Sequence, residues 1–336
     1  MTAPGLARSR PDVWPPALLA ALAALALPLV GSPSTWLTLS LAGLAMGLII
    51  FVIASGLTLV FGLMDVLNFG HGVFIAVGAF VAVSVLGGLD GWAGSPQLGP
   101  NLAAVALAAG AAMLVAGAAG LVFERLLVRP VYGRHLEQIL VTTGGMIIGQ
   151  ELIKTLWGPE ERPLALPPSL RGAFVFPFAG DTVAVEKYRV LAVGVGLLVF
   201  GALLWVLGRT KLGLLIRAGV QDREMVQSLG YRIDRLFVAV FVAGSALAGL
   251  GGVMWGLYQQ GVTPQIGARV NVLIFIVIII GGLGSTLGCF VGALAVGLVA
   301  NYTGYLAPKA ALFSNIGLMM VVLLWRPRGL YPVTSR

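Results

Sequence analysis

An absence of charge near the amino terminus constrains the fold of this chain more than any other feature. From Val13 to Met64 the sequence contains no Asp, Glu, Lys or Arg. A helix needs roughly 20 apolar residues to cross a bilayer, so this run alone accommodates two spans. Later apolar runs are also continuous, whereas a membrane β-barrel would show segments of about 10 residues with alternating polarity. The sequence therefore predicts an all-α fold, a polytopic transmembrane helical bundle.

Composition excludes several other classes of protein. The 336 residues are 58% hydrophobic and 10% charged, whereas about a quarter of the residues in a soluble domain are charged. A net charge of +8 would suggest nucleic-acid binding in a soluble protein. In a membrane protein it fits basic cytoplasmic loops, so we expect no nucleic-acid partner. The single cysteine, Cys289, and two histidines leave little for a disulfide or a metal site.

The apolar runs predict about 8 to 10 spans in one transmembrane domain that covers residues 1–336. The candidate spans are approximately 15–31, 36–63, 68–89, 101–123, 138–157, 189–208, 236–258, 272–300 and 310–325. The first follows Arg8 and Arg10, as in a signal peptide. No clear small-residue cleavage site follows it, so we expect a retained helix.

Loop charge predicts the orientation of the bundle. Arg and Lys gather at the amino terminus, in the loops 124–137 and 209–235, and in the carboxy-terminal tail, so we place all of these in the cytoplasm. The loops 90–100 and 158–188 are then external. A single helix over 272–300 would leave the basic tail outside. A break at GGLGSTLG (281–288), with the first half turning back as a re-entrant hairpin, corrects this, and transporters place such broken helices at substrate sites.

A second glycine-broken segment is GLMDVLNFGHGVF (62–74). In a continuous helix Asp65, Asn68 and His71 would share one face, and polar groups at membrane depth usually face the bundle interior or an aqueous path. Two interpretations are open. These residues line a substrate path, or Asp65 ends one helix, Asn68 caps the next and His71 bonds a neighbouring helix.

Two further patterns predict packing and a hairpin. Small residues recur at intervals of four, which allows helices to approach closely: Gly244, Ala248, Gly252 and Gly256, and also Gly284, Gly288 and Gly292. In the external loop, FVFPF (174–178) and TVAVE (182–186) flank Ala179-Gly180-Asp181, which predicts a small β-hairpin.

The loop 208–236 combines charged residues of both signs with apolar ones. Met225, Val226 and Leu229 would form one apolar face of a short helix, with Gly219 before it and Gly230 after it. A linker lying on lipid should have a basic polar face, so the mixed charge favours docking to a partner protein.

Three functional classes fit this composition: a transporter subunit, a channel, or an intramembrane enzyme. The sequence has no GxxxxGK[ST], HExxH or GxSxG motif, and we assign no catalytic residues. A transporter that uses a separate ATPase explains both the structured cytoplasmic loop and the missing phosphate-binding loop.

Four motifs, in order, resemble the permeases of branched-chain amino acid ABC transporters. They are GLTLVFGLMDVLNFGHGVFIAVGAF (56–80), ERLLVRPVYGR (124–134) followed by QILVTTGGMIIGQ (138–150), TKLGLLIRAGVQDREMVQSLGYRIDRL (210–236), and IIIGGLGSTLGCFVGALAVG (278–297). The resemblance implies an importer subunit in the bacterial cytoplasmic membrane, with both termini in the cytoplasm. Its partners would be a similar second permease subunit, two ATPase subunits, an extracytoplasmic solute-binding protein and membrane lipid.

The resemblance also implies roles for particular residues. The ATPase-coupling positions would be Arg217, Gly219, Asp222, Arg223, Glu224, Met225, Leu229 and Gly230, and the substrate path would involve Asn68, Gly70, His71, Gly72, Gly282, Gly284 and Ser285. This chain would bind no cofactor or metal, since ATP belongs to the partner subunits. Family members often carry an acid after the His-Gly pair, whereas Val73 follows it here. Leucine, isoleucine and valine are the expected substrates, and urea, short amides and small aromatic acids are the alternatives.

Overall fold

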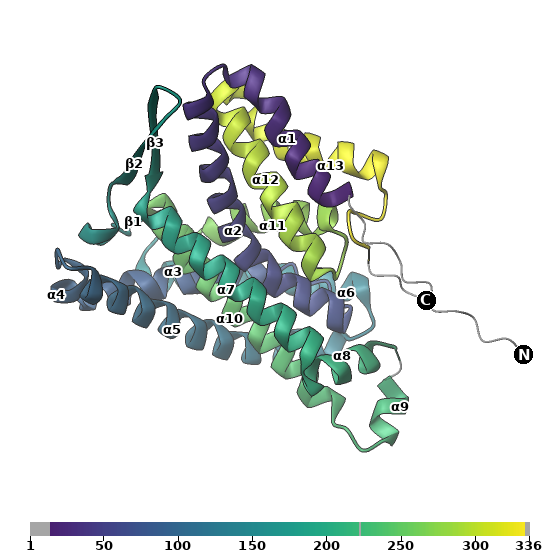
Figure 1. Cartoon of the computed structure of the whole chain (residues 1–336). Coiled ribbons are helices and arrows are strands. Elements are labelled where there is room, and N and C mark those ends of the chain that lie inside the picture. Colours follow the sequence, from purple (N-terminus) through teal and green to yellow (C-terminus); the bar gives the residue numbers. More distant parts are fainter. Residues whose placement is uncertain (1–13, 222, 333–336) are drawn as a thin grey trace, which may run out of the picture.

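The computed structural model describes residues 14–332 with the exception of Asp222, and it is a bundle of helices (Figure 1). The long helices are α1 (Trp14–Val30), α2 (Pro33–Met64), α3 (His71–Gly88), α5 (Leu98–Phe123), α6 (His135–Trp157), α7 (Lys187–Arg209), α10 (Ile233–Gln259), α11 (Ile266–Gly281), α12 (Thr286–Leu306) and α13 (Ala311–Trp325). The predicted all-α polytopic fold is confirmed.

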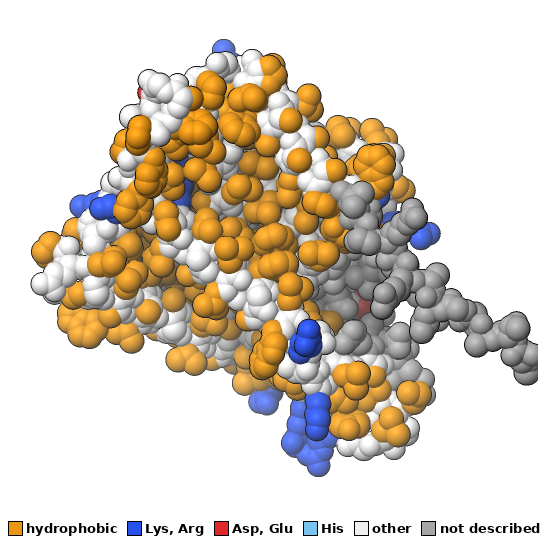
Figure 2. All heavy atoms as spheres, viewed as in Figure 1, with side chains coloured by type: hydrophobic (Ala, Val, Ile, Leu, Met, Phe, Trp, Pro, Cys, Tyr) orange, Lys and Arg blue, Asp and Glu red, His pale blue; other side chains and the backbone are white. Residues whose placement is uncertain are grey.

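Length and apolar composition identify the helices that are able to cross a membrane. Within the described residues six qualify: α2, α3, α7, α10, α12, and α5 together with its continuation to Val131. Shorter apolar helices are α1, α11 and Phe313–Trp325. Hydrophobic side chains cover most of the face of the molecule seen in Figure 2, and Lys and Arg lie mainly at its edges.

Short elements connect these helices. They are α4 (Asp90–Ala93), the π-helical turn η1 (Glu124–Val128), the 3₁₀ turns η2 (Arg129–Val131), η3 (Pro168–Leu170) and η4 (Pro308–Ala310), α8 (Lys211–Gln221), α9 (Arg223–Ser228), and strands β1 (Arg162–Pro163), β2 (Ala173–Phe178), β3 (Asp181–Glu186) and β4 (Gly261–Val262). Strand β1 pairs with β4, and β2 with β3. The predicted hairpin is confirmed, and Ala179 and Gly180 at its turn have φ of 50° and 81°, as a two-residue I′ turn requires.

Helix α2 lies at the centre and joins two groups of helices. It packs on α12, which contacts α1, α11 and α13, and on α10, which contacts α3 and α5 (Figure 1). The contact with α10 is close because small residues face each other: a Cβ added to Gly244 would lie 2.7 Å from the carbonyl oxygen of Gly56. The predicted packing role of the stripe that begins at Gly244 is therefore what the structure shows.

The long apolar segment 272–300 is broken where the sequence predicts. Helix α11 ends at Gly281, α12 begins at Thr286, and Gly282 and Gly284 between them have φ of 97° and 80°. The two helices are antiparallel, because Gly281 lies beside Gly288 and a Cβ on Gly292 would lie 2.9 Å from the carbonyl of Val277. The first helix starts at Ile266, six residues before the predicted boundary at 272, because it also includes the polar residues Arg269 and Asn271.

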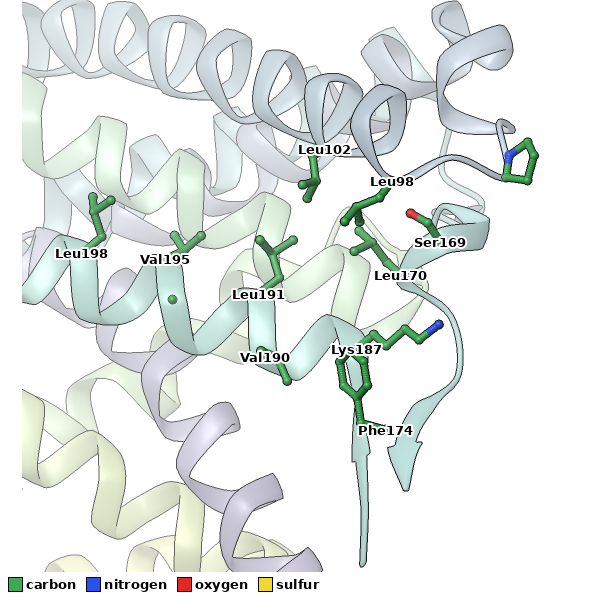
Figure 3. A pocket seen from close by; sticks show the side chains of 12 residues that line it. Leu98, Leu102, Ser169, Leu170, Phe174, Lys187, Val190, Leu191, Val195 and Leu198 are labelled. Carbon is green, nitrogen blue, oxygen red and sulfur yellow. The ribbon is translucent and has the colours of Figure 1, made fainter. Parts of the chain in front are cut away.

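An apolar groove runs along the side of the bundle between α5 and α7 (Figure 3). It has a volume of about 690 Å³, and Leu98 and Leu102 of α5 face Leu191 and Val195 of α7 across it. Its one charged lining residue is Lys187, at one end. A wall of this composition offers few hydrogen-bond partners for a polar ligand such as an amino acid.

Candidate functional site

The polar segment of 62–74 contains the connection between α2 and α3, in which six residues, 65–70, lie outside any helix. Helix α2 ends at Met64, and Asp65 adopts the left-handed conformation (φ 51°, ψ 38°) while its N–H donates to the carbonyl of Phe61. Helix α3 begins only at His71. The predicted common helical face of Asp65, Asn68 and His71 is therefore wrong, because the chain turns out of the helix between the first two.

Side chains from two other helices bond the backbone of this connection. The N–H of Leu67 donates to Oε1 of Gln138 (3.2 Å), and the N–H of Phe69 donates to Oγ1 of Thr142 (3.1 Å), both from α6. From α11, Nδ2 of Asn271 donates to the carbonyl of Phe69 (2.9 Å). All three side chains are buried. Non-helical backbone inside a membrane bundle needs such partners, because no water is present to replace them.

Asn68 is the least satisfied polar side chain in the connection. It is fully buried, and within the described chain neither its Nδ2 nor its Oδ1 has a hydrogen-bond partner. The interpretation in which Asn68 caps α3 is wrong, because Gly70 occupies the N-cap position without a side-chain bond. Buried amides are almost always paired, so Asn68 gives this site unused capacity to donate and accept hydrogen bonds.

His71 bonds the neighbouring helix, as one of the two interpretations states. Its ring is fully buried, and Nε2 lies 3.3 Å from the carbonyl of Ile53 in α2. The next residue, Gly72, permits the close approach of α11: a Cβ there would lie 2.6 Å from the carbonyl of Gly267. His71 and Gly72 therefore fix the start of α3 against both α2 and α11.

The residues of the second break serve as caps and contacts. Ser285 caps α12 by accepting the N–H of Gly288 (3.0 Å). Gly282 lies against the backbone of Tyr331 and Arg328, and Gly284 lies against Gly62 of α2. The structure thus brings the two glycine-broken segments together, and Asn68 and His71 follow Gly62 in the same connection. Whether these residues border a substrate path stays a prediction.

The predicted coupling loop forms two helices, α8 and α9, at one end of the bundle (Figure 1). Gly219 lies inside α8, so its predicted place as the boundary of one short helix is wrong; Gly230 (φ 87°) does follow the end of α9. The predicted common apolar face is also wrong. Val226 is buried in a cluster with Ile233 and Phe237, whereas Met225 and Leu229 are 55% and 66% exposed.

Four of the predicted coupling positions are not fully described. Asp222 lies outside the described residues, and so do the side chains of Arg217, Arg223 and Glu224. The described part nevertheless contacts the core of the bundle, because Met64 at the end of α2 packs on the cluster around Val226.

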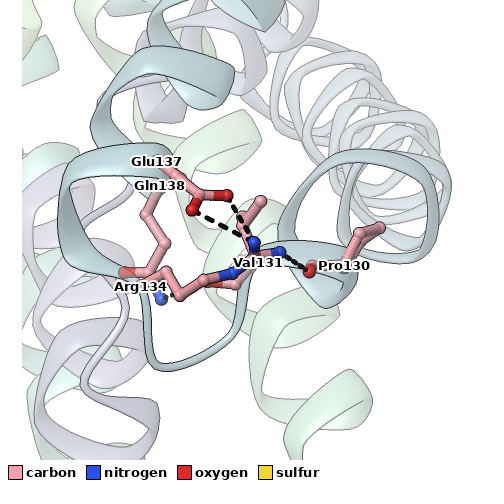
Figure 4. Close-up of polar contacts among 5 residues, drawn as sticks. All are labelled: Pro130, Val131, Arg134, Glu137 and Gln138. Carbon is pink, nitrogen blue, oxygen red and sulfur yellow. Dashed lines mark hydrogen bonds and ion pairs between the residues drawn. The ribbon is translucent and has the colours of Figure 1, made fainter.

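Polar contacts hold the turn between α5 and α6, and Gln138 joins this turn to the 65–70 connection (Figure 4). Arg134 forms a 2.8 Å ion pair with Glu137 and donates to the carbonyl of Pro130 (2.6 Å). Gln138 has two roles: its Oε1 bonds Leu67, and its Nε2 donates to the carbonyl of Val131 (3.2 Å). The described residues contain no group of three or more His, Cys, Asp or Glu side chains that could hold a metal ion.

Comparison with known proteins gives the family. Residues 39–324 match the family model described as branched-chain amino acid transport system / permease component. The chain belongs to this family. It is 31% identical to the high-affinity branched-chain amino acid transport system permease protein BraD of Pseudomonas aeruginosa. The aligned 299 residues cover 86% of this chain and 93% of BraD.

Two relatives from Escherichia coli belong to the same named system. The permease protein LivH is 28% identical over 293 residues, 86% of this chain and 92% of its own. The permease protein LivM is 27% identical over 313 residues, 88% of this chain and 70% of its own. No solved structure matches the chain.

Within this permease, Val73 takes the position after His71-Gly72 at which family members often carry an acid. The Val73 side chain is buried on the side of α3 that faces α6. A Cβ added to Gly149 of α6 would lie 2.7 Å from both methyl carbons of Val73. Val73 therefore packs against α6.

The residues that the sequence did not identify are Gln138, Thr142 and Asn271. Their signal was weak, since Gln138 and Thr142 are isolated polar side chains in the predicted span 138–157, and Asn271 comes just before the predicted span 272–300. Gln138 and Thr142 are four residues apart and share one face of α6, and that face meets the connection.

Proposed function

We propose that this permease is the membrane subunit of an ATP-binding-cassette importer that carries branched-chain amino acids, namely leucine, isoleucine and valine. The observation that carries this proposal is the family match over residues 39–324. The motifs that carry the resemblance also form the connection, the α5–α6 turn, α8–α9 and the α11–α12 turn, which contact one another in the bundle.

The proposed complex contains further subunits. Because the chain is similar to both LivH and LivM, which carry different names within one transport system, we expect a similar, non-identical permease beside it. Two ATPase subunits would bind ATP, and a solute-binding protein would deliver the substrate. We place both termini in the cytoplasm of a bacterial cell, and reporter fusions at the carboxy terminus would test this orientation.

Helices α8 and α9 are the proposed docking site for the ATPase. Met225 of α9 and Leu229, the residue directly after α9, are exposed, so a partner can bury them. Val226 on the opposite side contacts the cluster that includes Met64, which is next to the 65–70 connection. A force on α9 therefore has a packed route to the end of α2 and to the connection, as mechanical coupling between two sites requires.

The proposed substrate path passes the connection. Asn68, with its unpaired amide, is the residue best able to bind the polar groups of an amino acid. Gly70, His71, Gly72, Gly282, Gly284 and Ser285 are the other proposed path residues. Their glycines are now packed against backbone, so the two breaks would have to separate for substrate to pass.

Uptake of labelled leucine tests the proposal in source cells with and without this gene, challenged by excess valine, urea or benzoate. We expect uptake to be lost on deletion, restored by the gene, and blocked by valine alone. If deletion leaves leucine uptake unchanged in cells that have no other leucine importer, the substrate assignment is wrong. Uptake of labelled urea or benzoate that depends on the gene would then identify the substrate.

A further inference from the structure

A basic cavity lies beside α9, between the end of α5 and the start of α10. Its volume is about 750 Å³. Arg125 and Arg129 line it from η1 and η2, and Arg232 and Arg235 line it from the start of α10. The single acidic lining residue is Asp234. The cavity is therefore strongly positive.

Within the described part of the chain, none of the four arginines forms an ion pair. The ion pairs of the described chain involve Arg134, His135, Lys154 and Arg189, and none involves a cavity arginine. All four arginines are exposed. Helix α10 adds the positive end of its dipole at Ile233, where Arg232 in the N-cap position provides no side-chain acceptor. Among the described lining residues, an anion would thus meet several donors and one carboxylate, that of Asp234.

One wall of the cavity continues into the apolar side of the bundle. Val238 lines the cavity from α10. Along the helix that carries Arg125, the side chains of Val122 and Leu126 are 56% and 69% exposed. Tyr231, which also lines the cavity, is 51% exposed, and tyrosine is enriched where membrane proteins cross the membrane–water interface. The cavity therefore joins a charged surface to an apolar one.

We propose that this cavity binds the phosphodiester headgroup of an anionic phospholipid, with its acyl chains along the exposed side of α5. Guanidinium groups bind phosphate oxygens in pairs, and basic pockets between membrane helices are typical sites for anionic headgroups. An acidic protein surface would satisfy the arginines but would not explain the apolar wall. The site connects η1 with the α9–α10 junction, and it does not depend on which substrate the permease carries.

Native mass spectrometry of the full-length permease, purified in detergent, tests this site. The probes are phosphatidylglycerol, phosphatidylcholine and inorganic phosphate. We expect phosphatidylglycerol to bind and phosphatidylcholine not to compete. Each of two double variants, Arg125→Gln/Arg129→Gln and Arg232→Gln/Arg235→Gln, should weaken binding about thirtyfold, since one basic residue near an anionic surface contributes about fivefold. The matched control Arg269→Gln/Lys309→Gln removes two exposed charges elsewhere and should bind within about twofold of the wild type.

Thermal unfolding without lipid shows whether each variant is folded. Equal phosphatidylglycerol binding by the wild type and by folded cavity variants would overturn the proposal. So would displacement of the lipid by inorganic phosphate at the same concentration, because the cavity would then be a site for free phosphate. If the cavity variants release the ATPases in lipid-free detergent but bind lipid normally, the surface belongs to a protein interface and the proposal fails.

Discussion

Gly62 of α2 and Gly284 of the α11–α12 turn lie against each other, and a Cβ on Gly284 would lie 2.7 Å from the Cα of Gly62. This contact joins two segments that are more than 200 positions apart in the sequence. It leaves no room for a side chain on either residue. A methyl group added to Gly62 or Gly284 should therefore force the two segments apart.

The substitution Gly62→Ala should destabilise the permease, because its Cβ would lie 2.6 Å from the Cα of Gly284. Overpacking of this kind costs about 1–3 kcal/mol of the free energy of unfolding. Chemical denaturation in detergent measures it. Gly110→Ala is the matched control, because Gly110 is also inside a membrane helix and an added Cβ there meets no atom within 4 Å. Equal stability of the two variants would contradict this account of the contact.

Gln138→Met should lower the free energy of unfolding by about 1–3 kcal/mol, because it leaves the buried N–H of Leu67 without its acceptor. Asn68→Leu, which keeps the branching of the side chain, removes an amide that has no partner among the described residues. It should therefore cost less stability than Gln138→Met. Denaturation curves of both variants, measured in one detergent, check the order.

The same Asn68→Leu variant tests the path assignment. We expect it to reduce leucine uptake several-fold at a normal protein level, because the buried amide has no hydrogen-bond partner among the described residues and is able to bind polar groups of a substrate. Wild-type uptake by a fully expressed variant would remove Asn68 from the path. His71→Ala should likewise lower uptake without preventing assembly of the complex.

Leu229→Ala should weaken co-purification of the ATPase while changing stability by less than about 0.5 kcal/mol, because Leu229 is exposed directly after α9. Val226→Ala should act mainly on stability. It removes buried methyl groups from the cluster with Ile233 and Phe237 and should lower the free energy of unfolding by about 1–3 kcal/mol. Pull-down of the ATPase and thermal unfolding separate the two effects. Full ATPase binding by Leu229→Ala would move the docking site away from this face.

The β2–β3 hairpin should respond to acid. The hydrogen bond from Ser34 to Asp181 (2.8 Å), and then the backbone N–H of Thr182, hold the pKa of the Asp181 carboxyl below its ordinary value. A lowered pKa means that the contribution of this carboxylate is present above the unfolded pKa and is lost as the pH falls through the folded pKa. Hydrogen exchange of residues 173–186, corrected for the intrinsic pH dependence of amide exchange, should show the hairpin loosening in acid.

The variant Ser34→Ala is the control for that effect. Without the serine hydroxyl, the pKa of Asp181 should rise toward its ordinary value, and the hairpin should be looser at neutral pH. Its protection should then change less on acidification than that of the wild type. An identical pH response in both proteins would show that the Ser34–Asp181 bond does not hold the hairpin.

Much of the fold was predictable because it depends on local chemistry. Continuous apolar runs predicted most helices to within a few residues, the glycines of 281–288 predicted the break, and the Gly180-Asp181 turn predicted the hairpin. These features arise from neighbours in the sequence. Loop charge and crossing parity predicted that the first half of 272–300 turns back, and α11 and α12 are antiparallel.

The functional segment was less predictable, because tertiary contacts decide it. The helical period placed Asp65 and Asn68 on one face, but Asp65 turns the chain out of α2. What holds the resulting connection are Gln138 and Asn271, which lie 71 and 202 positions from the backbone groups that they bond. The periodicity of a local segment carries no information on partners so far away in the sequence. The helical period also could not show that Val226 is buried while Leu229 is exposed. Val226 packs inward only because α10 begins beside it.

The connection between α2 and α3 has a mechanical consequence. Inside a helix the main-chain bonds form a ladder, and a bend breaks several together. Here three separate side-chain bonds, at Leu67 and Phe69, hold the backbone. Each can exchange without unwinding α2, α6 or α11. The connection is therefore held by bonds that can break one at a time, so we expect the proposed movement of α9 to rearrange it in small steps.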